Sequence, residues 1–322
     1  MNLSFTIDEL EQAAALVYAH MPPTPQYPWP LLAMRAGCEV WVKHENHTPI
    51  GAFKVRGGLH YMQRLKQEQP CITGVITATR GNHGQSIGYA ARVTGMKATI
   101  LVPFGNNPEK NAAMRALGVD LIEHGNDFQE AAEHAATLAV SQGFHMVPSF
   151  HANLVAGVAS YGLEFFRAVE NIDAVFVAVG MGSGVSSLIC ARNALGLKTK
   201  IYGVVAENAP AYSLSFHAGR KVTTDSADTL ADGVACRVPD DLALETIIEG
   251  AADIITVSEG EILAAMAHYL TDTHNVAEGA GAVPLAALLQ RRDEFAGQRV
   301  GLVLSGGNAD KAQIMQALQA GQ

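Results

Sequence analysis

Residues 174–190 read Ala-Val-Phe-Val-Ala-Val-Gly-Met-Gly-Ser-Gly-Val-Ser-Ser-Leu-Ile-Cys, an apolar run, a glycine-rich turn and a second apolar segment. Ala174–Val179 has the length of a strand, and the segment from about Val185 to Leu195 has helical spacing. Glycines let the backbone approach a ligand closely, and the first turn of a helix directs unpaired N–H groups toward an anion. The stretch therefore predicts a strand–turn–helix unit whose turn binds a phosphate. The alternative is a tight turn that binds nothing.

The same alternation of strand-length and helix-length segments runs along the chain on both sides of this unit. Several of the short runs are rich in Val and Ile with little polar alternation, which is typical of parallel strands covered on both faces. The pattern predicts an α/β fold with mostly parallel, open sheets flanked by helices. The other expected strands are Glu39–Lys43, Gly74–Ala78, Ala98–Val102, Asp120–Glu123, His145–Val147, Lys200–Ala206, Ile254–Val257 and Val300–Leu304.

Helix starts are marked by capping residues at two places. Thr6 with Glu9, and Ser258 with Glu261, stand at the spacing at which each side chain binds a free backbone N–H of the first turn. The remaining expected helices run from about Phe53 to Gln67, His83 to Thr94, Pro108 to Leu117, Phe128 to Ser141, Asn153 to Val169, and Val283 to Asp293.

The domain organisation follows from length and from the grouping of the strands. A chain of 322 residues suggests two domains, with one large α/β unit as the alternative, and it contains no repeat and no low-complexity linker. The strands between about residues 74 and 147 form a self-contained set. We therefore expect residues 49–146 to form a small mobile domain, and residues 1–48 and 147–322 to form a large one.

Composition excludes several classes of partner. Lys and Arg number 22 against 31 Asp and Glu, which gives a net charge of −9 with no long basic run, so nucleic acid is not an expected partner. No stretch approaches the roughly 20 uninterrupted apolar residues of a membrane span. Met1 to Glu11 carries acids where a secretory signal carries positive charge, so a cytoplasmic location is expected.

Cysteine and histidine patterns argue against a metal site. The cysteines, Cys38, Cys71, Cys190 and Cys236, are scattered without a Cys-x-x-Cys pair, so neither a disulfide framework nor structural zinc is expected. In residues 44–47, His-Glu-Asn-His, the histidines are three apart rather than four, which does not fit the H-E-x-x-H zinc motif.

A dinucleotide-binding protein is the alternative interpretation of the glycine-rich turn. Glu207 ends the next apolar run, near where a ribose-binding acid would stand. Counted from Gly180, however, the G-x-G-x-x-G pattern requires glycine at position 185, where this chain has Val185. An NAD-binding oxidoreductase also leaves the other polar clusters unexplained.

Three further clusters carry groups suited to chemistry. A second strand-to-helix turn is expected in residues 77–85, Thr-Ala-Thr-Arg-Gly-Asn-His-Gly-Gln. Its hydroxyl, amide and backbone N–H donors are suited to binding a carboxylate. Residues 305–308, Ser-Gly-Gly-Asn, follow another strand, and ligands of open α/β sheets bind at such carboxyl ends. Lys54, beside Phe53 at a helix start, can form an imine with a carbonyl cofactor if its pKa is depressed.

Together these motifs resemble those of the fold-type II pyridoxal-phosphate enzymes, in the branch of the serine/threonine dehydratases and serine racemases. The resemblance runs from about His44 to Asn308, with the motifs in family order. Phe53-Lys54-x-Arg56-Gly57 is similar to the cofactor-lysine motif and Gly81-Asn82-His83-Gly84 to the substrate-carboxylate loop. Gly180 to Gly184 is similar to the phosphate loop and Ser305 to Asn308 to the ring-nitrogen motif. The resemblance implies two domains of the tryptophan synthase β type and the cofactor pyridoxal 5'-phosphate.

The resemblance also implies a role for each matching residue. Lys54 binds the cofactor covalently and takes the α-proton of the substrate, and Phe53 lies against the ring. Asn82 binds the ring hydroxyl and Ser305 the ring nitrogen, while Gly180, Met181, Gly182, Ser183 and Gly184 hold the phosphate. The substrate carboxylate is implied at Thr79, Gly81, Asn82 and His83. Glu278 matches a family glutamate near the cofactor, although a helix-start acid without such a role remains the alternative.

A hydroxyl at the ring nitrogen makes the ring a weaker electron sink than a carboxylate partner does, which favours elimination over transamination. We therefore expect an ammonia-lyase that converts a β-hydroxy amino acid of the threonine and serine class to a 2-oxo acid and ammonia. Less common substrates remain open: hydroxyaspartate, phenylserine or a hydroxyectoine breakdown product. A β-replacement enzyme or a non-catalytic relative would also carry these motifs.

Two departures from the family pattern bear on specificity and activation. Arg80 stands where racemases of this group carry serine, so racemisation is not expected, and its guanidinium could pair with a second anionic group of a substrate. An arginine that pairs with the protein or faces solvent is the alternative. The family's cation site is half matched, by Glu207 and Ala211, while its further acid position holds Ser213. The family analogy implies a homodimer or higher homo-oligomer.

Overall fold

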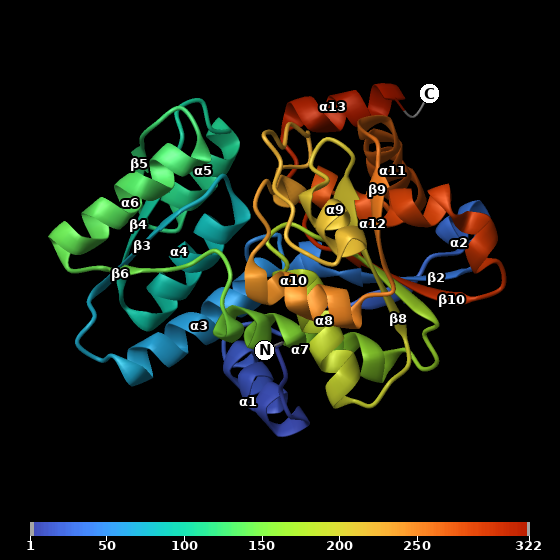
Figure 1. The fold of residues 1–322 in the computed structure, drawn as a ribbon, viewed down its shortest axis with the longest axis horizontal. Coiled ribbons are helices and arrows are strands. Elements are labelled where there is room, and N and C mark those ends of the chain that lie inside the picture. Colours follow the sequence, from blue (N-terminus) through green and yellow to red (C-terminus); the bar gives the residue numbers. More distant parts are fainter. Residues whose placement is uncertain (1–2, 321–322) are drawn as a thin grey trace.

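The computed structural model describes residues 3–320, which form two sheets flanked by helices (Figure 1). The six-stranded sheet has the order β1-β2-β10-β7-β8-β9 and the four-stranded sheet the order β5-β4-β3-β6. All pairings are parallel except that of β1 with β2. The strands are β1 Gln26–Pro28, β2 Glu39–His44, β3 Gly74–Ala78, β4 Lys97–Val102, β5 Asp120–Glu123, β6 His145–Met146, β7 Ala174–Ala178, β8 Lys200–Ala206, β9 Asp253–Val257 and β10 Arg299–Leu304.

Helices cover both faces of each sheet, which confirms the predicted fold class. They are α1 Ile7–Tyr18, α2 Pro30–Ala36, α3 Lys54–Glu68, α4 Asn82–Thr94, α5 Pro108–Ala116, α6 Phe128–Gln142, α7 Ala152–Ala168, α8 Ser183–Ala194, α9 Ala211–Ala218, α10 Asp241–Gly250, α11 Glu259–Thr273, α12 Gly279–Gln290 and α13 Lys311–Ala320. Short 3-10 helices are η1 Glu45–His47, η2 Asp232–Val234 and η3 Arg292–Phe295. Within residues 3–320, no helix combines the length and apolar character that crossing a membrane requires.

The predicted elements form with small shifts at their ends. Every predicted strand is present with each end within one residue, and both predicted capping boxes form, at Thr6 and at Ser258. The helix expected from Val283 begins instead at Gly279 and includes Pro284. Residues 279–288 are all buried, so packing rather than local propensity sets this start. The sequence also did not predict β1, α2, α9, α10 and α13.

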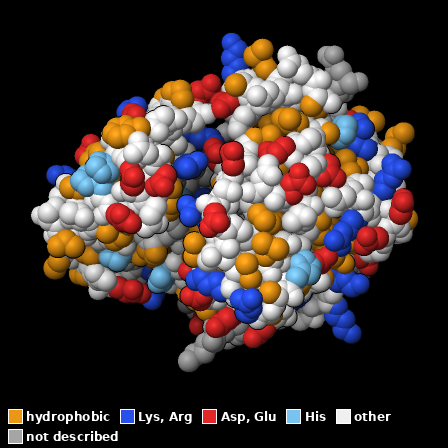
Figure 2. Space-filling view, turned by 45° about the horizontal axis from the view of Figure 1, so that its top comes forward, with side chains coloured by type: hydrophobic (Ala, Val, Ile, Leu, Met, Phe, Trp, Pro, Cys, Tyr) orange, Lys and Arg blue, Asp and Glu red, His pale blue; other side chains and the backbone are white. Residues whose placement is uncertain are grey.

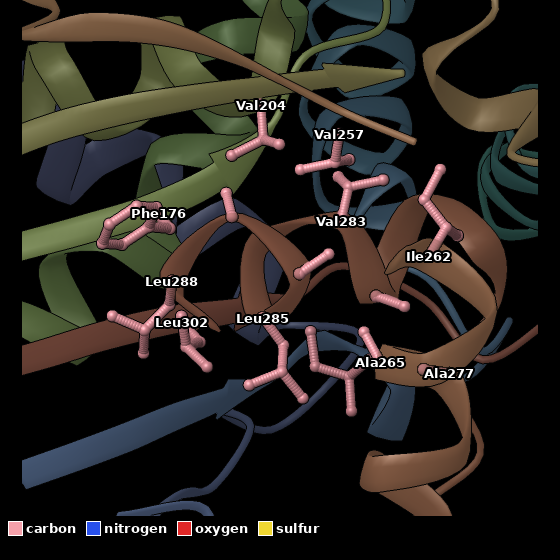
Figure 3. Packing of buried hydrophobic residues seen from close by; sticks show 14 of the residues in the cluster. Phe176, Val204, Val257, Ile262, Ala265, Ala277, Val283, Leu285, Leu288 and Leu302 are labelled. Atoms are coloured by element: carbon pink, nitrogen blue, oxygen red, sulfur yellow. The ribbon is translucent and has the colours of Figure 1, made fainter. Parts of the chain in front are cut away.

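The hydrophobic core of the six-stranded sheet is built around α12. Figure 3 shows Val283, Leu285 and Leu288 of α12 against side chains of β7, β8, β9, β10 and α11. A second buried cluster, which includes residues of α7, α8 and α10, covers the opposite face. Burial on both faces explains why these strands read as continuous apolar runs.

The four-stranded sheet has its own core. Val75 and Ile100 pack with residues of α3 and α4, while Ile76 and Leu101 on the other face pack with α6. The strands expected between residues 74 and 147 therefore make a separate sheet. We call this sheet with α4, α5 and α6 the small lobe, and the six-stranded sheet with its helices the large lobe. The domain limits at residues 48/49 and 146/147 stay a prediction, and residues 1–2 and 321–322 of the predicted large domain lie outside the described residues.

The first turn of α3 is fixed by a buried ionic cluster. Arg56, with 0% of its side chain exposed, bonds Glu45 at 2.7 Å and Glu164 at 2.6 Å. The guanidinium also donates to the hydroxyls of Ser160 and Thr24. Because each charge has an opposite partner and hydrogen bonds, the cost of burying these charges is offset.

Close backbone packing fixes the same turn from two other sides. A Cβ on Gly157 of α7 would stand 2.5 Å from the carbonyl oxygen of Arg56, and one on Gly58 would stand 2.3 Å from Oγ of Ser86 in α4. The Ser86 hydroxyl donates to the carbonyl oxygen of Lys54 at 2.5 Å. The position of Lys54 is therefore set by its contacts with α4 and by the packing of α3 on α7.

Replacing Arg56 should destabilise the fold strongly. Arg56→Met leaves the buried Glu45 without its ion-pair partner and Glu164 with Lys43 alone, so we expect urea unfolding to show a loss of about 3–5 kcal/mol. The matched control is Arg64→Met on the same helix, where an exposed pair with Glu68 is lost, and its effect should stay near ~0.5 kcal/mol. Equal effects of the two substitutions would show that the cluster does not fix α3.

Candidate active site

A main-chain seam joins the start of α3 to the end of β10. The N–H of Phe53 donates to the carbonyl oxygen of Ser305 at 3.0 Å, and the N–H of Gly307 donates to that of Gly51 at 2.9 Å. Ala52 and Gly306 form an antiparallel bridge between these two bonds. Two of the predicted motifs, some 250 positions apart in sequence, are thereby held side by side.

Phe53 lies between Lys54 and the glycine-rich turn. Nζ of Lys54 stands 5.0 Å from the centroid of the Phe53 ring. Cζ of that ring is 3.6 Å from the place a Cβ on Gly184 would occupy, and Tyr161 meets the ring edge-on at 6.2 Å. The lysine motif, the glycine-rich turn and Ser305 are therefore close together in the fold, as a single site that combines them requires.

Burial changes the acid–base behaviour of Lys54. Removal from water lowers the pKa of its amine to about 8, while the nearby Glu278 carboxyl acts in the opposite direction. A lysine with this pKa has a much larger neutral fraction near pH 7 than an ordinary surface lysine has. Lys54 can therefore act as a nucleophile toward a carbonyl group or as a base.

The glycine-rich turn is shaped as a cradle at the start of α8. A Cβ on Gly180 would stand 2.1 Å from the carbonyl oxygen of Gly233, and Gly182 has φ +97°, which favours glycine. No side chain caps α8, so the N–H groups of its first turn, beginning at Ser183, are available to a ligand. The carbonyl oxygen of Met181 is already bound, by the Tyr212 hydroxyl at 3.0 Å.

The turn at residues 79–83 offers donors in the same way. The Thr79 hydroxyl accepts the N–H of Gly81 at 3.0 Å, and α4 begins at Asn82 with no side-chain cap. The buried Nε2 of His83 has no hydrogen-bond partner among the described residues. Burial lowers the pKa of His83 to about 3, so this imidazole is neutral near pH 7.

Two groups of the large lobe orient the side chain of Asn82. Its Oδ1 accepts from Nδ2 of Asn308 at 2.8 Å, and its Nδ2 donates to Oε1 of Glu278 at 2.7 Å. The second N–H of the Asn82 amide has no partner among residues 3–320. The sequence singled out the motif that contains Asn308 but gave that residue no role, because only the folded chain places its amide against Asn82.

Glu278 is buried beside Gly306, where a Cβ would stand 2.5 Å from its Oε1. Burial raises the pKa of this carboxyl, against the lowering effects of Lys110, Asn82 and Lys54. Glu278 also precedes α12, but its side chain makes no capping hydrogen bond there. Its contact with Asn82 places it in the site.

Arg80 lies at the surface beside this turn. Its side chain is exposed, and it makes no hydrogen bond or ion pair with residues 3–320. A salt bridge between Arg80 and another part of the chain therefore has no support in the described structure.

The positions that half match a cation site lie before and within the first turn of α9. Glu207 is exposed, Ala211 is buried, and the Ser213 hydroxyl donates to the carbonyl oxygen of Ile254 at 3.0 Å. In residues 44–47, Glu45 bonds Arg56, and Nε2 of His44 accepts from Trp29. The described part of the chain holds no group of three or more His, Cys, Asp or Glu side chains suited to a metal ion.

The donor set fits pyridoxal phosphate. It combines a desolvated lysine amine for an aldehyde, an aromatic side chain beside it, a glycine cradle at a helix start for a phosphate, and the buried hydroxyl of Ser305. A dinucleotide-binding site fits the structure less well than a pyridoxal-phosphate site does. The position of its third glycine is held by Val185, whose side chain is fully buried.

Comparison with known proteins also indicates an enzyme that uses pyridoxal phosphate. The sequence profile of the pyridoxal-phosphate dependent enzyme family matches residues 17–306. An L-threonine ammonia-lyase of Thermotoga maritima is 35% identical over 292 residues, which cover 90% of this chain and 72% of the relative. An L-threo-3-hydroxyaspartate ammonia-lyase of Pseudomonas is 33% identical over 288 residues, covering 89% and 90%. The structure of threonine deaminase isoform 2 from Solanum lycopersicum superposes with a TM-score of 0.90 at 29% identity, covering 99% of this chain and 95% of that one.

The lowered pKa of Lys54 should be measurable in the cofactor-free protein. If the protein is pulse-labelled with an amine reagent between pH 6 and pH 11, the peptide that carries Lys54 should reach half its maximal reaction rate near pH 8. The midpoint falls below that of an ordinary lysine because burial penalises the charged ammonium, so the amine is neutral at lower pH. A midpoint near that of an ordinary lysine amine, about 10.4, would contradict the desolvation of this side chain.

Proposed function

We propose that this chain, which belongs to the family of pyridoxal-phosphate-dependent enzymes, is an ammonia-lyase. It converts a β-hydroxy amino acid of the threonine and serine class to a 2-oxo acid and ammonia. The observation that carries the proposal is the desolvated amine of Lys54, whose neighbour Phe53 is bonded through its backbone to Ser305. Relatives with one third of their residues identical are named for this reaction.

Each part of the cofactor has a group to hold it. Lys54 would bind the aldehyde, Phe53 would contact the ring, and the second N–H of Asn82 would serve the ring hydroxyl. Residues 180–184, Gly-Met-Gly-Ser-Gly, would hold the phosphate with backbone N–H groups, and the Ser305 hydroxyl would serve the ring nitrogen. When bound, the cofactor supplies a carbonyl carbon that takes the substrate amine and a ring that withdraws electrons from Cα.

The chain's own residues bind the substrate and move its proton. The turn of Thr79, Gly81, Asn82 and His83 receives the α-carboxylate through backbone donors at the start of α4. With substrate bound, the neutral Nζ of Lys54 would take the proton from Cα. The β-hydroxyl would leave as water by taking up one proton, which balances the proton that Lys54 removes, and water would hydrolyse the released enamine to the 2-oxo acid and ammonia.

Ser305 selects among the reactions that such a site can run. A hydroxyl does not keep the ring nitrogen protonated as a carboxylate would, so a long-lived negative charge on the substrate is less stabilised. Departure of the β-hydroxyl together with the loss of the α-proton is then favoured over transamination. The buried position of Ser305, 4% exposed, keeps water from replacing its hydroxyl.

Within this activity, Arg80 favours a substrate with a second anionic group. Its guanidinium is unpaired beside the carboxylate turn, where it can bind a side-chain carboxylate such as that of 3-hydroxyaspartate. Two of the relatives are L-threo-3-hydroxyaspartate ammonia-lyases, at 33% and 30% identity. Phenylserine and a hydroxyectoine breakdown product remain candidate substrates within the class.

Assembly and location belong to the same proposal. We expect a homodimer or higher homo-oligomer that works in the cytoplasm. Exposed apolar side chains on α2, Leu31 and Met34, are consistent with a surface covered by a second copy. Sedimentation equilibrium measures the oligomeric state directly.

The proposed reaction should release 2-oxo acid and ammonia in equal amounts. With pyridoxal phosphate added, serine, threonine, 3-hydroxyaspartate and phenylserine should be tested without an added thiol or NAD. Lys54→Ala should lower kcat by about 10³-fold or more because the proton acceptor is lost, whereas Lys66→Ala, at the exposed end of the same helix, should leave it unchanged.

Three outcomes of this assay would reject the lyase. Turnover that needs a thiol would identify a β-replacement enzyme, and reduction of NAD would identify an oxidoreductase. If cofactor binds but no hydroxy amino acid is turned over, the chain is a non-catalytic relative.

The role of Arg80 is tested by relative rather than absolute activity. Arg80→Ala should lower kcat/KM for 3-hydroxyaspartate by roughly 10-fold or more relative to serine and threonine, because a charge-assisted hydrogen bond is lost. Arg92→Ala, an exposed arginine in the last turn of α4, the helix that follows Arg80, is the matched control. Unchanged ratios among the three substrates would show that Arg80 does not select the substrate.

A further inference from the structure

Lys110 of α5 lies against the turn that is proposed to bind the substrate carboxylate. Its Cδ is 3.1 Å from the place a Cβ on Gly81 would occupy, and only 9% of its side chain is exposed. The aliphatic part of Lys110 therefore covers Gly81. Lys110 belongs to the small lobe, and the sequence patterns gave it no role.

The ammonium of Lys110 reaches a residue of the large lobe. Its Nζ is 2.6 Å from Oδ2 of Asp232 in η2. The next residue, Gly233, places its carbonyl oxygen against Gly180, where a Cβ would stand 2.1 Å away. Gly233 also packs on α12, since its own Cβ would stand 2.7 Å from that of Ala280. Asp232 is thus attached to the wall of the glycine cradle.

A second contact joins the lobes beside this ion pair. Nδ2 of Asn107, which caps α5 with its Oδ1, donates to Oδ2 of Asp310 at 2.5 Å. Figure 2 shows a hollow between the lobes with Lys and Arg side chains gathered along it. The start of α5 therefore bridges the two lobes at the substrate turn.

We propose that Lys110 and Asp232 form a clasp that holds the substrate-carboxylate turn in register with the phosphate cradle when the two lobes are closed. Both are positioning residues, because they act through Gly81 and Gly233, and on the charge of Glu278, rather than on the reacting atoms. The assignment of the two turns to carboxylate and phosphate rests on the proposed function. The ion pair itself does not.

Loss of the clasp should lower the fraction of enzyme molecules in the closed arrangement. Substrate binds the closed arrangement, so a lower closed fraction weakens apparent binding by that fraction, while the fully bound enzyme keeps its geometry. The pair is mostly buried, so solvent screens it less than a surface pair. Loss of the clasp should therefore raise KM and leave kcat nearly unchanged, which general damage to the fold would not do.

The test is a double-mutant cycle in the cofactor-loaded enzyme. Lys110→Met and Asp232→Asn should each raise KM for the amino acid about tenfold, with kcat within about twofold. The double variant should be no worse than either single one, because both remove the same interaction. Hydrogen exchange of amides in 81–94 and 228–240, measured without substrate, should become about tenfold faster in each variant.

Arg115→Met is the matched control on the same helix. Arg115 pairs with Glu123 at 3.2 Å, inside the small lobe and at the surface, so its loss should change neither KM nor exchange in 228–240. Variants of Lys110 and Asp232 that behave like this control would overturn the clasp. So would a rise in KM for Lys110→Met alone, because it would indicate a direct contact of Lys110 with substrate.

The clasp can be tested even if the proposed function is wrong. If the wild-type chain turns over no hydroxy amino acid, the exchange comparison still decides the clasp. Faster exchange on both sides of the hollow in both single variants, but not in Arg115→Met, would support it. Unchanged exchange would reject it.

Discussion

The short antiparallel seam between residues 50–53 and residues 305–308 is the constraint on which the site depends. Its two N–H to carbonyl bonds fix the backbone of Phe53 against that of Ser305. Glycine is needed on both sides, because Gly51 has φ +69° and a Cβ on Gly306 would collide with Glu278. The seam bonds the residue before the lysine directly to the segment that carries the hydroxyl, in addition to the packing of α3 on α4 and α7.

Burial then gives the assembled groups their chemistry. The Lys54 amine and the His83 imidazole both shift toward their neutral forms, and the Glu278 carboxyl shifts toward protonation. Such shifts cost stability, and the neighbouring charge cluster of Arg56, Glu45 and Glu164 holds the first turn of α3 in place. A fixed, desolvated amine is what covalent binding of an aldehyde requires.

The sequence predicted what local pattern controls and missed what only tertiary contact decides. Strands buried on both faces, such as β7, are visible as apolar runs, and the Thr6 and Ser258 caps mark helix starts. β1 has three residues, too few for a periodic signal. Lys110 and Asp232 carry no local signal, and the motif around Asn308 gave that residue no role, because their partners lie on other segments of the chain. The domain limits remain predictions from the sequence.

Reduction with borohydride tests the central claim most directly. In the cofactor-loaded protein it should convert the covalent bond between Lys54 and pyridoxal phosphate into a stable amine, and peptide mass mapping should find the added cofactor on residue 54. The phosphate-cradle variant Gly180→Ala should reduce this labelling, because a Cβ there meets Gly233. Labelling of a different lysine, or none at all in protein that binds the cofactor, would contradict the account.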